Sequence, residues 1–435
     1  MNILVISHNV FSRTSAMGKT LSSYFERFPT DSIAQFYIHS EVPVRDDVCV
    51  RYFRFTDTDA LKARLPWKEY GTVFDRADIQ NGRRFSRTDS GLKARLYQRG
   101  RRRTAMIYFL RNLIWKSAFW KTEKYQKWVS DFRPDIVFFA SGDYAFMYEI
   151  ARYTADLANC PLVVSCMDDY YLKKGEQNWL SNLARASFMR DVCRTMKRAD
   201  LLVCMCDEMS RAYAHMFHVE AHTLYTGVKA AADKSDGCGT QISYVGNIGA
   251  LRLGALEEIG RALADLHAEH APAQLDVYSQ EGDAAILERL KRARGIAFHG
   301  PVSADGVREV MKRSMLMVHV ESMQDPEVNP ARFSVSTKIA ETLMNGPCLL
   351  AYGRGGLASV DYLQKHHAAY VITSKEKLKE GLQEIITHPE LRSRILYNAR
   401  ELAQKNHTEQ SVSACVSAYL EQAKENFIHE RGGKA

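Results

Sequence analysis

Residues 333–353 read FSVSTKIAETLMNGPCLLAYG, and the pattern of this segment indicates the fold class of the chain. Small hydroxyl residues near its start are typical helix caps, and apolar residues then recur at helical spacing. Gly346 lies where a C-terminal cap is expected, and Pro347 prevents the helix from continuing. The apolar run 348–352 has the character of a buried strand. The stretch therefore predicts a loop, a helix and a parallel strand in succession, which is the repeating unit of an α/β domain.

The start of this predicted helix has the chemistry of a phosphate site. A helix N-terminus offers unpaired N–H groups and the positive end of a dipole, so it favours anions. Ser336 and Thr337 place their amides in the first turn, and Lys338 adds a formal charge there. Glu341, about one turn further on, is placed to accept hydrogen bonds from sugar hydroxyls. The sequence thus predicts a nucleotide-diphosphate site, and the alternative is an ordinary capped helix, because such caps are common.

The segment 336–347 resembles the donor-site segment of the retaining glycosyltransferases of family 4, which share the two-domain GT-B fold. Many members carry two glutamates eight positions apart in this segment. Glu341 matches the second, whereas Phe333 stands at the first. A subgroup carries a Ser/Pro-x-Lys-x-x-Glu pattern before the Gly-Pro pair, and Ser336, Lys338 and Glu341 fit it. The resemblance implies a nucleotide-diphosphate sugar as donor substrate and no separate cofactor.

Two further segments of the second half resemble the family's donor site. In the family, a strand is followed by a glycine, a basic residue and, five positions later, a second basic residue. Gly246 matches the glycine and Arg252 the second basic residue, whereas Asn247 stands at the first. Arg332, just before the donor segment, is the candidate for the missing charge. The run 298–302 resembles the loop that borders the nucleotide base, which adds Gly300 and Val302 to the expected donor-binding residues.

The first half supplies fewer matches. The N-terminal run 2–8 is expected to be a buried strand, and Gly18 in the following segment matches a glycine that the family often has near the donor phosphates and the acceptor. A Walker loop or a dinucleotide fingerprint would need additional glycines in this segment, so the sequence has neither motif there.

Two adjacent acids close another predicted strand. Asp168 and Asp169 follow the apolar run 162–167, at the carboxyl end where chemistry gathers in open α/β sheets. Relatives often have an acidic or histidine pair at this place, on the acceptor side, so these residues are expected to orient the acceptor. The alternative is a helix cap by one of them. No metal is expected, because one acidic dipeptide is a weak signal and this architecture does not normally need an ion.

Composition sets the broad class. The 435 residues are 46% hydrophobic and 25% charged, which is typical of a globular protein, and no apolar run is long enough for a transmembrane helix. The N-terminus lacks the features of a signal peptide. Nine scattered cysteines indicate free thiols in a reducing compartment, and hence a cytoplasmic protein. The formal net charge of +8 favours an anionic partner.

The most basic segment runs from residue 93 to residue 128. Eleven basic residues there are opposed by Glu123 alone: Lys93, Arg95, Arg99, Arg101, Arg102, Arg103, Arg111, Lys116, Lys121, Lys124 and Lys127. Aromatic residues lie between them, a pattern that predicts peripheral contact with an anionic membrane surface. The alternative is a solvated basic helix whose aromatic residues pack on the sheet. Nucleic acid is not an expected partner, because no base-reading motif accompanies the charge.

Alternating strands and helices in both halves predict two doubly wound, Rossmann-like domains facing across a cleft. We expect an acceptor-side domain over 1–228 with a basic insertion around 56–128, a nucleotide-sugar-binding domain over 240–410, and a helix over 411–428 that crosses back to the first domain.

The resemblance implies transfer of a sugar, with retention of anomeric configuration, to a glycan, a lipid-linked acceptor or a cell-surface polysaccharide at the inner face of the membrane. Arg252, Lys338 and the helix amides would stabilise the leaving diphosphate. The alternatives are a sugar-nucleotide epimerase or hydrolase on the same fold, and a non-catalytic partner of another glycosyltransferase.

Overall fold

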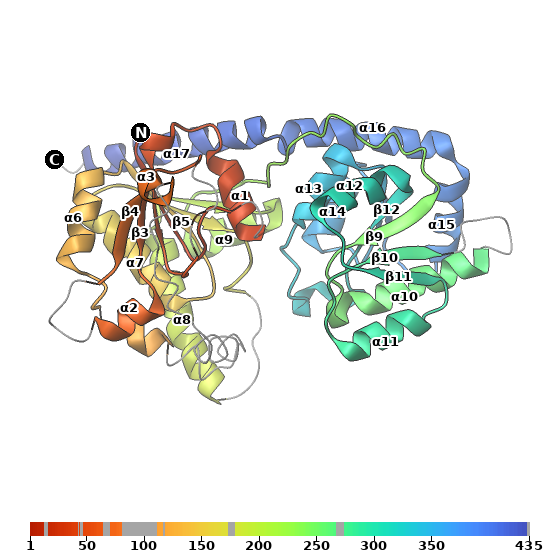
Figure 1. Ribbon diagram of the computed structural model, residues 1–435, viewed down its shortest axis with the longest axis horizontal. Coiled ribbons are helices and arrows are strands. Elements are labelled where there is room, and N and C mark those ends of the chain that lie inside the picture. The colour runs from red at the N-terminus through yellow and green to blue at the C-terminus, as the bar shows by residue number, and fades with distance from the viewer. Residues whose placement is uncertain are drawn as a thin grey trace. The chain divides into compact units, whose positions relative to one another are not determined.

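The computed structural model describes residues 1–12, 16–41, 43, 47–63, 70–80, 111–115, 118–172, 179–266 and 274–432. The chain forms two compact units, residues 1–224 together with 412–435, and residues 225–411 (Figure 1). Each unit has its own, mainly parallel β-sheet, so the predicted class of two Rossmann-like α/β domains is confirmed. The change of unit falls at Tyr225, a few residues before the predicted end of the first domain. Among the described residues no helix has the length and apolar character needed to cross a membrane.

Eight strands form the sheet of the first unit, in the order β4-β3-β2-β1-β5-β6-β7-β8. All neighbouring pairs are parallel except β3 and β4 at one edge. The strands are β1 (Ile3–Ser7), β2 (Ile33–Tyr37), β3 (Arg51–Arg54), β4 (Thr72–Asp75), β5 (Ile136–Ala140), β6 (Leu162–Cys166), β7 (Leu201–Cys204) and β8 (Ala221–Thr223). The α-helices are α1 (Ala16–Phe25), α2 (Asp57–Lys62), α3 (Arg76–Gln80), α6 (Glu123–Phe132), α7 (Ala145–Ala158), α8 (Trp179–Arg198), α9 (Asp207–Phe217) and α17 (Glu409–Gly432). Strand order reverses between β1 and β5, and the crevice of such a sheet lies at the carboxyl ends of those strands.

The last helix, α17, completes the core of the first unit. Its apolar side chains at 412, 416, 420 and 423 recur at helical spacing and are buried in the same cluster as β1 and β5. Lys424 also pairs with Asp135, which precedes β5, at 2.7 Å. Burial of this apolar stripe explains why residues 412–435 belong to the first unit although the second unit separates them from it in sequence.

The predicted insertion around 56–128 begins with regular structure. Thr56 caps α2 through a reciprocal pair of contacts, because its hydroxyl accepts the Asp59 N–H while the Asp59 carboxylate accepts the Thr56 N–H. The strand β4 then adds to the sheet edge, antiparallel to β3. A capping-box pattern in the sequence, Thr-x-x-Asp, was the available signal for this helix. Residues 81–110 and 116–117 lie outside the described part of the chain.

The described tryptophans of the basic segment pack inside the first unit. Trp115 is 1% exposed and stacks on Phe146 at 4.3 Å between ring centroids. Trp120 and Trp128 are also buried, whereas Phe119 is 47% exposed. The tryptophans therefore belong to the core, as the alternative interpretation of this segment predicts. The arginines at 101–103 lie outside the described residues.

Six parallel strands form the sheet of the second unit, in the order β11-β10-β9-β12-β13-β14. The strands are β9 (Gln241–Val245), β10 (Leu275–Tyr278), β11 (Ile296–Gly300), β12 (Ser314–Val320), β13 (Cys348–Tyr352) and β14 (Tyr370–Ile372). The helices are α10 (Gly249–Leu266), α11 (Ala284–Arg292), α12 (Ala304–Arg313), α13 (Thr337–Asn345), α14 (Ala358–Lys365), α15 (Leu378–Thr387) and α16 (Pro389–Asn406). Strand order reverses between β9 and β12, which places the crevice of this sheet at their carboxyl ends.

A buried histidine ties together the two segments by which the chain enters and leaves the second unit. The Nδ1 atom of His407 lies 3.1 Å from the carbonyl oxygen of Thr226, and its Nε2 atom lies 2.9 Å from the hydroxyl of Tyr362. Because a carbonyl can only accept, Nδ1 carries the proton and Nε2 accepts from Tyr362. Burial lowers the pKa of His407 to about 4. The neutral ring thus donates one hydrogen bond, to the Thr226 carbonyl, and accepts one, from the Tyr362 hydroxyl.

Protonation of His407 is expected to destabilise the second unit as pH falls. Its folded pKa of about 4 lies below the unfolded value of 6.5, so the unfolded chain binds more protons between these values. Stability is unaffected above pH 6.5 and declines towards pH 4, by up to about 1.4 kcal/mol per pH unit. Urea unfolding over this range, compared between the protein and a His407→Gln variant, should show a slope smaller by about one proton in the variant. An unchanged slope would contradict the neutral state assigned to this ring.

Candidate functional site

The helix predicted within residues 333–353 is α13, and the strand that follows it is β13. Ser336 is the N-cap of α13, and its hydroxyl accepts the backbone N–H of Lys338 at 3.4 Å. At the other end, the Gly346 N–H donates to the carbonyl of Thr342. The apolar face of α13 is buried, so the helix is held with its N-terminal turn at the carboxyl ends of the strands. This places the helix dipole towards the crevice expected between β9 and β12.

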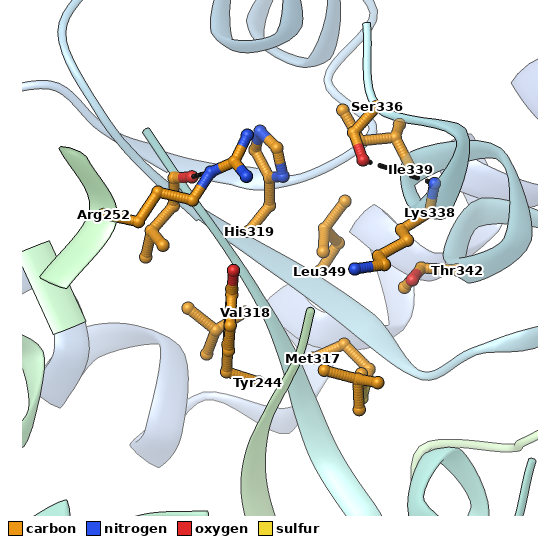
Figure 2. A pocket seen from close by; sticks show the side chains of 12 residues that line it. Tyr244, Arg252, Met317, Val318, His319, Ser336, Lys338, Ile339, Thr342 and Leu349 are labelled. Carbon is orange, nitrogen blue, oxygen red and sulfur yellow. Dashed lines mark hydrogen bonds between the residues drawn. The ribbon is translucent and has the colours of Figure 1, made fainter. Parts of the chain in front are cut away.

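A small cavity of about 40 Å³ lies beside this helix (Figure 2). Its volume is enough for about one to three water molecules and too small for a nucleotide, so it forms the floor of a site. The residues that line it come from β9, α10, β12, α13 and β13: Tyr244, Val245, Arg252, Met317, Val318, His319, Val320, Ser336, Lys338, Ile339, Thr342 and Leu349. The cavity therefore joins Arg252, Ser336 and Lys338, which were expected to bind the donor, to residues that were not predicted.

Arg252 is fixed by acceptors at the end of β12. Its Nε donates to the carbonyl of Val320 at 3.1 Å, and its Nη2 pairs with Glu321 Oε1 at 2.9 Å. Burial disfavours the charged form of Arg252, but Glu321 and Tyr244 outweigh this cost and raise its pKa. The guanidinium is thus a permanent positive charge in a defined position, 29% exposed and open to an incoming anion.

Lys338 supplies a second cation to the same cavity. Its side chain extends from α13 towards the lining residues (Figure 2). Burial lowers the pKa of the Lys338 ammonium, and Arg252 lowers it further, whereas Glu341 raises it. Repulsion between two cations is the expected state of a site that awaits an anion, because a bound diphosphate would neutralise both. Glu341 is half-buried on the next turn of α13.

The absence of a side chain at Gly246 leaves room for the ammonium of Lys338. A Cβ atom at residue 246 would lie 2.6 Å from the Lys338 Nζ and 3.0 Å from the Tyr244 hydroxyl. The ammonium therefore lies against the backbone of the β9–α10 loop, where a side chain would displace it. The same loop carries Asn247, whose carbonyl accepts from the Tyr244 hydroxyl at 2.5 Å and from Arg252 Nη1 at 3.4 Å.

The Gly246→Ala variant is expected to bind the donor nucleotide about tenfold more weakly, because the new methyl group must push the Lys338 ammonium away from its place. Lysine is flexible, so the cost in stability should stay below about 1 kcal/mol. Isothermal titration measures the affinity. The matched control is Gly254→Ala, within α10, where a Cβ meets no atom within 4 Å and where alanine should raise helix stability. Equal affinities of the two variants would show that the Lys338 position does not affect binding.

The remaining residues expected at the donor site lie around this cavity. Arg332 pairs with Glu327 at 2.8 Å and lies over the ring of Phe333 at 4.9 Å, so its charge is already balanced in this state. Phe333 is buried, in the place where many relatives have a glutamate. Thr337 is the first residue of α13.

Gly300 and Val302 belong to the run 298–302, which is expected to border the base. Gly300 ends β11 with a φ of +78°, which is a conformation that favours glycine. Its neighbour His299 bonds Asp276 Oδ1 through Nε2 at 2.7 Å and stacks on Tyr278. Gly300 thus lies at the carboxyl edge of the sheet, next to the aromatic pair, and Val302 follows it by two residues.

In the first unit, the two adjacent aspartates have different surroundings. Asp169 accepts three hydrogen bonds at one oxygen, from the N–H groups of Tyr171 and Leu172 and from the hydroxyl of Tyr213. Asp168 is exposed at the carboxyl end of β6 and accepts from the Tyr170 hydroxyl at 3.3 Å. Asp169 therefore has the contacts of a structural cap, and Asp168 is the one whose carboxylate faces solvent. Gly18 lies within α1, where its carbonyl accepts from Ser22.

Sequence reasoning missed two residues that line the cavity, Tyr244 and His319, and the carboxylate of Glu321, which pairs with Arg252. These residues lie at or next to the carboxyl ends of β9 and β12. A signal was present in the pattern His-Val-Glu, because polar residues at the end of an otherwise apolar, fully buried strand are unusual. For the described residues, no group of histidine, cysteine and acidic side chains forms a metal site.

Two family models match the sequence. A model described as glycosyl transferase-like matches residues 257–414, and one described as glycosyltransferase family 4 matches residues 83–231. The chain is a glycosyltransferase of the GT-B type. The GT-B glycosyltransferase fold is also that of its structural neighbours. No curated protein sequence matches it significantly.

The solved structures similar to this glycosyltransferase are distant in sequence. The Anabaena protein HepE in complex with UDP has 12% identity and a TM-score of 0.61, with 97% of this chain and 100% of that chain covered. Sucrose-phosphate synthase from Thermosynechococcus elongatus has 12% identity and a TM-score of 0.61, with 97% and 98% covered. WaaG, described as a glycosyltransferase involved in lipopolysaccharide biosynthesis, has 15% identity and a TM-score of 0.54, with 96% and 99% covered. These similarities establish the fold.

Proposed function

We propose that this glycosyltransferase moves a sugar from a nucleotide-diphosphate sugar to a glycan, lipid-linked or cell-surface polysaccharide acceptor, with retention of anomeric configuration. One observation carries the proposal: Arg252 and Lys338 line the same cavity at the N-terminus of α13, with Glu341 one turn further on. Two cations and a helix N-terminus suit a diphosphate, and a carboxylate beside them suits sugar hydroxyls. The solved structures of HepE contain UDP and UDP-glucose, which supports a nucleotide sugar as donor.

The chemical step needs charge stabilisation more than a nucleophile. As the bond between the anomeric carbon and the phosphate oxygen breaks, negative charge grows on the leaving diphosphate. Arg252, Lys338 and the first amides of α13 stabilise that charge. The acceptor hydroxyl attacks from the same face of the sugar, and its proton passes to the departing phosphate oxygen, so the new bond has the configuration of the old one. Asp168, exposed at the end of β6, is the carboxylate that we assign to orient the acceptor.

Thermal denaturation with UDP, GDP and ADP tests donor binding. A nucleotide present at 100 times its dissociation constant should stabilise the protein by about 2.7 kcal/mol. A Glu341→Gln variant should bind the stabilising nucleotide sugar more weakly, by about 1.5–3 kcal/mol, if this carboxylate accepts bonds from sugar hydroxyls. NMR of the product then reports whether the anomeric configuration is retained. Failure of all three nucleotides to shift the transition would remove the proposed donor site.

The non-catalytic alternative has a specific observation in its favour. Phe333 is buried where many relatives have a glutamate, and Asn247 is neutral where they have a cation. A protein that binds a nucleotide sugar through Arg252 and Lys338 but shows no turnover would fit this alternative. A sugar-nucleotide epimerase or hydrolase would instead convert or release the sugar without an acceptor, which the same product analysis distinguishes.

We also propose that the protein is cytoplasmic and contacts anionic membranes through the basic segment 93–128. Because the described tryptophans there are buried, this contact would depend on charge, at about 1 kcal/mol for each basic residue near the surface. Co-sedimentation with anionic vesicles should therefore decline at high salt. It should also decline when Arg101, Arg102 and Arg103 are all replaced by serine. Equal sedimentation of the two proteins would assign those arginines to another anionic partner.

A further inference from the structure

One buried polar atom of the cavity has no use in the functional scheme above. His319 lies on β12, is 9% exposed, and lines the cavity together with Arg252 and Lys338 (Figure 2). Among the described residues, its Nε2 atom has no hydrogen-bond partner. A buried nitrogen without a partner costs free energy, so a residue retained in this state points to a partner that arrives with a ligand.

The acceptor that lies near Nε2 within the protein is at the outer limit of hydrogen-bond distance. Nε2 of His319 lies 3.5 Å from Glu321 Oε1, and that oxygen accepts the shorter contact of 2.9 Å from Arg252. Glu321 is 4% exposed and is therefore fixed in its role as the counter-ion of Arg252. The imidazole is thus left beside an ion pair that it does not complete, on the same cavity as the Lys338 ammonium.

We propose that His319 is a third ligand of the donor diphosphate, with its Nε2–H donating to a phosphate oxygen between Arg252 and Lys338, and that diphosphate binding protonates this imidazole. The inference rests on the proposed donor site. It adds to that site an imidazole that is neutral in the free protein and takes up a proton when the diphosphate binds.

The charges around His319 explain why it would take up a proton on binding. The pKa of His319 is lowered to about 4, mainly by burial and also by the charges of Arg252 and Lys338, whereas Glu321 acts in the opposite direction. Tyr244, the remaining titratable group of the lining, faces the cavity from β9 and stays neutral, because burial raises its pKa to about 12. A diphosphate brings two or more negative charges, which reverses the sign of the local field and favours the imidazolium. One proton then passes from solvent to the imidazole, and the added positive charge offsets part of the charge on the leaving group.

The test is isothermal titration of the full-length protein at pH 6, with UDP and with inorganic pyrophosphate, in two buffers of different ionisation enthalpy. The wild-type protein should take up as much as about one proton per ligand. His319→Gln keeps a donor amide but does not titrate, so it should bind with little loss and without proton uptake. His319→Ala should bind both ligands about 10- to 100-fold more weakly. The control His388→Gln, an exposed histidine at the start of α16, should retain the wild-type proton uptake.

The outcomes separate this inference from the donor site itself. Proton uptake that persists in His319→Gln, or unchanged affinity in His319→Ala, would overturn the role of His319 while leaving the donor site in place if Lys338→Ala still weakens binding. If neither UDP nor pyrophosphate binds the wild-type protein, the donor site and this inference both fail. A purely structural histidine would change stability in both variants without changing the buffer dependence of the heat, which is a result that also contradicts the proposal.

Discussion

Replacement of Lys338 by alanine is expected to reduce sugar transfer by about a hundred- to a thousandfold, the usual effect of removing one preorganised electrostatic donor from a transition state. The ammonium lies against the backbone of Gly246 and shares its cavity with Arg252, so a diphosphate bound there would contact both cations. Because Lys338 has a lowered pKa in the free protein, it gains more from a bound anion than a lysine with an unshifted pKa would. The measurement is kcat/KM with the nucleotide sugar identified by thermal denaturation.

The matched control is Lys291→Ala, an exposed lysine on α11 of the same unit, which should transfer sugar at the wild-type rate. Lys338→Ala should also unfold within about 0.5 kcal/mol of the wild type, because its ammonium has no ion pair to lose among the described residues. Near-normal turnover of Lys338→Ala would remove this lysine from the reaction. A large loss of stability would assign it a structural role instead.

The donor helix was predictable because its signals are local. Ser336, Gly346 and Pro347 act through their own backbone neighbours, so the bounds of α13 and β13 follow from a short stretch of sequence. The same holds for the alternation of strands and helices that predicts two α/β domains. The family resemblance placed Arg252 and Lys338 at the donor site, and they do line one cavity.

The floor of the cavity was not predictable, because it depends on contacts between distant segments. Tyr244, His319 and Lys338 come from β9, β12 and α13, which the fold brings together at the reversal of strand order. No spacing rule connects residues this far apart in sequence. The position of α17 depends likewise on tertiary burial of its apolar stripe, and its membership of the first unit was expected from the family resemblance alone.

Asp168 and Asp169 show the limit of reading chemistry from an adjacent pair. Sequence assigns the same role to both, since both follow β6. The structure separates them, because the Asp169 carboxylate accepts two backbone N–H groups and the Tyr213 hydroxyl, whereas Asp168 faces solvent. Which of two neighbouring acids forms a cap depends on the direction of the chain after the strand, and that direction is set by packing.

Replacement of Arg252 by methionine is expected to destabilise the second unit by about 3 kcal/mol, because it leaves the Glu321 carboxylate buried without its partner. We expect the lower end of the usual range, since the Arg252 side chain is 29% exposed and water can replace part of the lost contact. For a unit of this size the loss corresponds to a decrease of about 10 °C in the transition temperature. Sugar transfer should fall as well, through loss of one of the two cations that hold the diphosphate.

A second substitution separates the two effects of this change. In the double variant Arg252→Met with Glu321→Gln the unpaired charge is gone, so most of the stability should return, since removing both partners of a buried pair costs far less than removing one. Transfer should stay low in the double variant, because the diphosphate still lacks a cation. Recovery of both properties together would show that Arg252 acts only by neutralising Glu321. If neither stability nor transfer returns, the contribution of Arg252 to stability comes from its hydrogen bonds to the Val320 and Asn247 carbonyls and not from its charge.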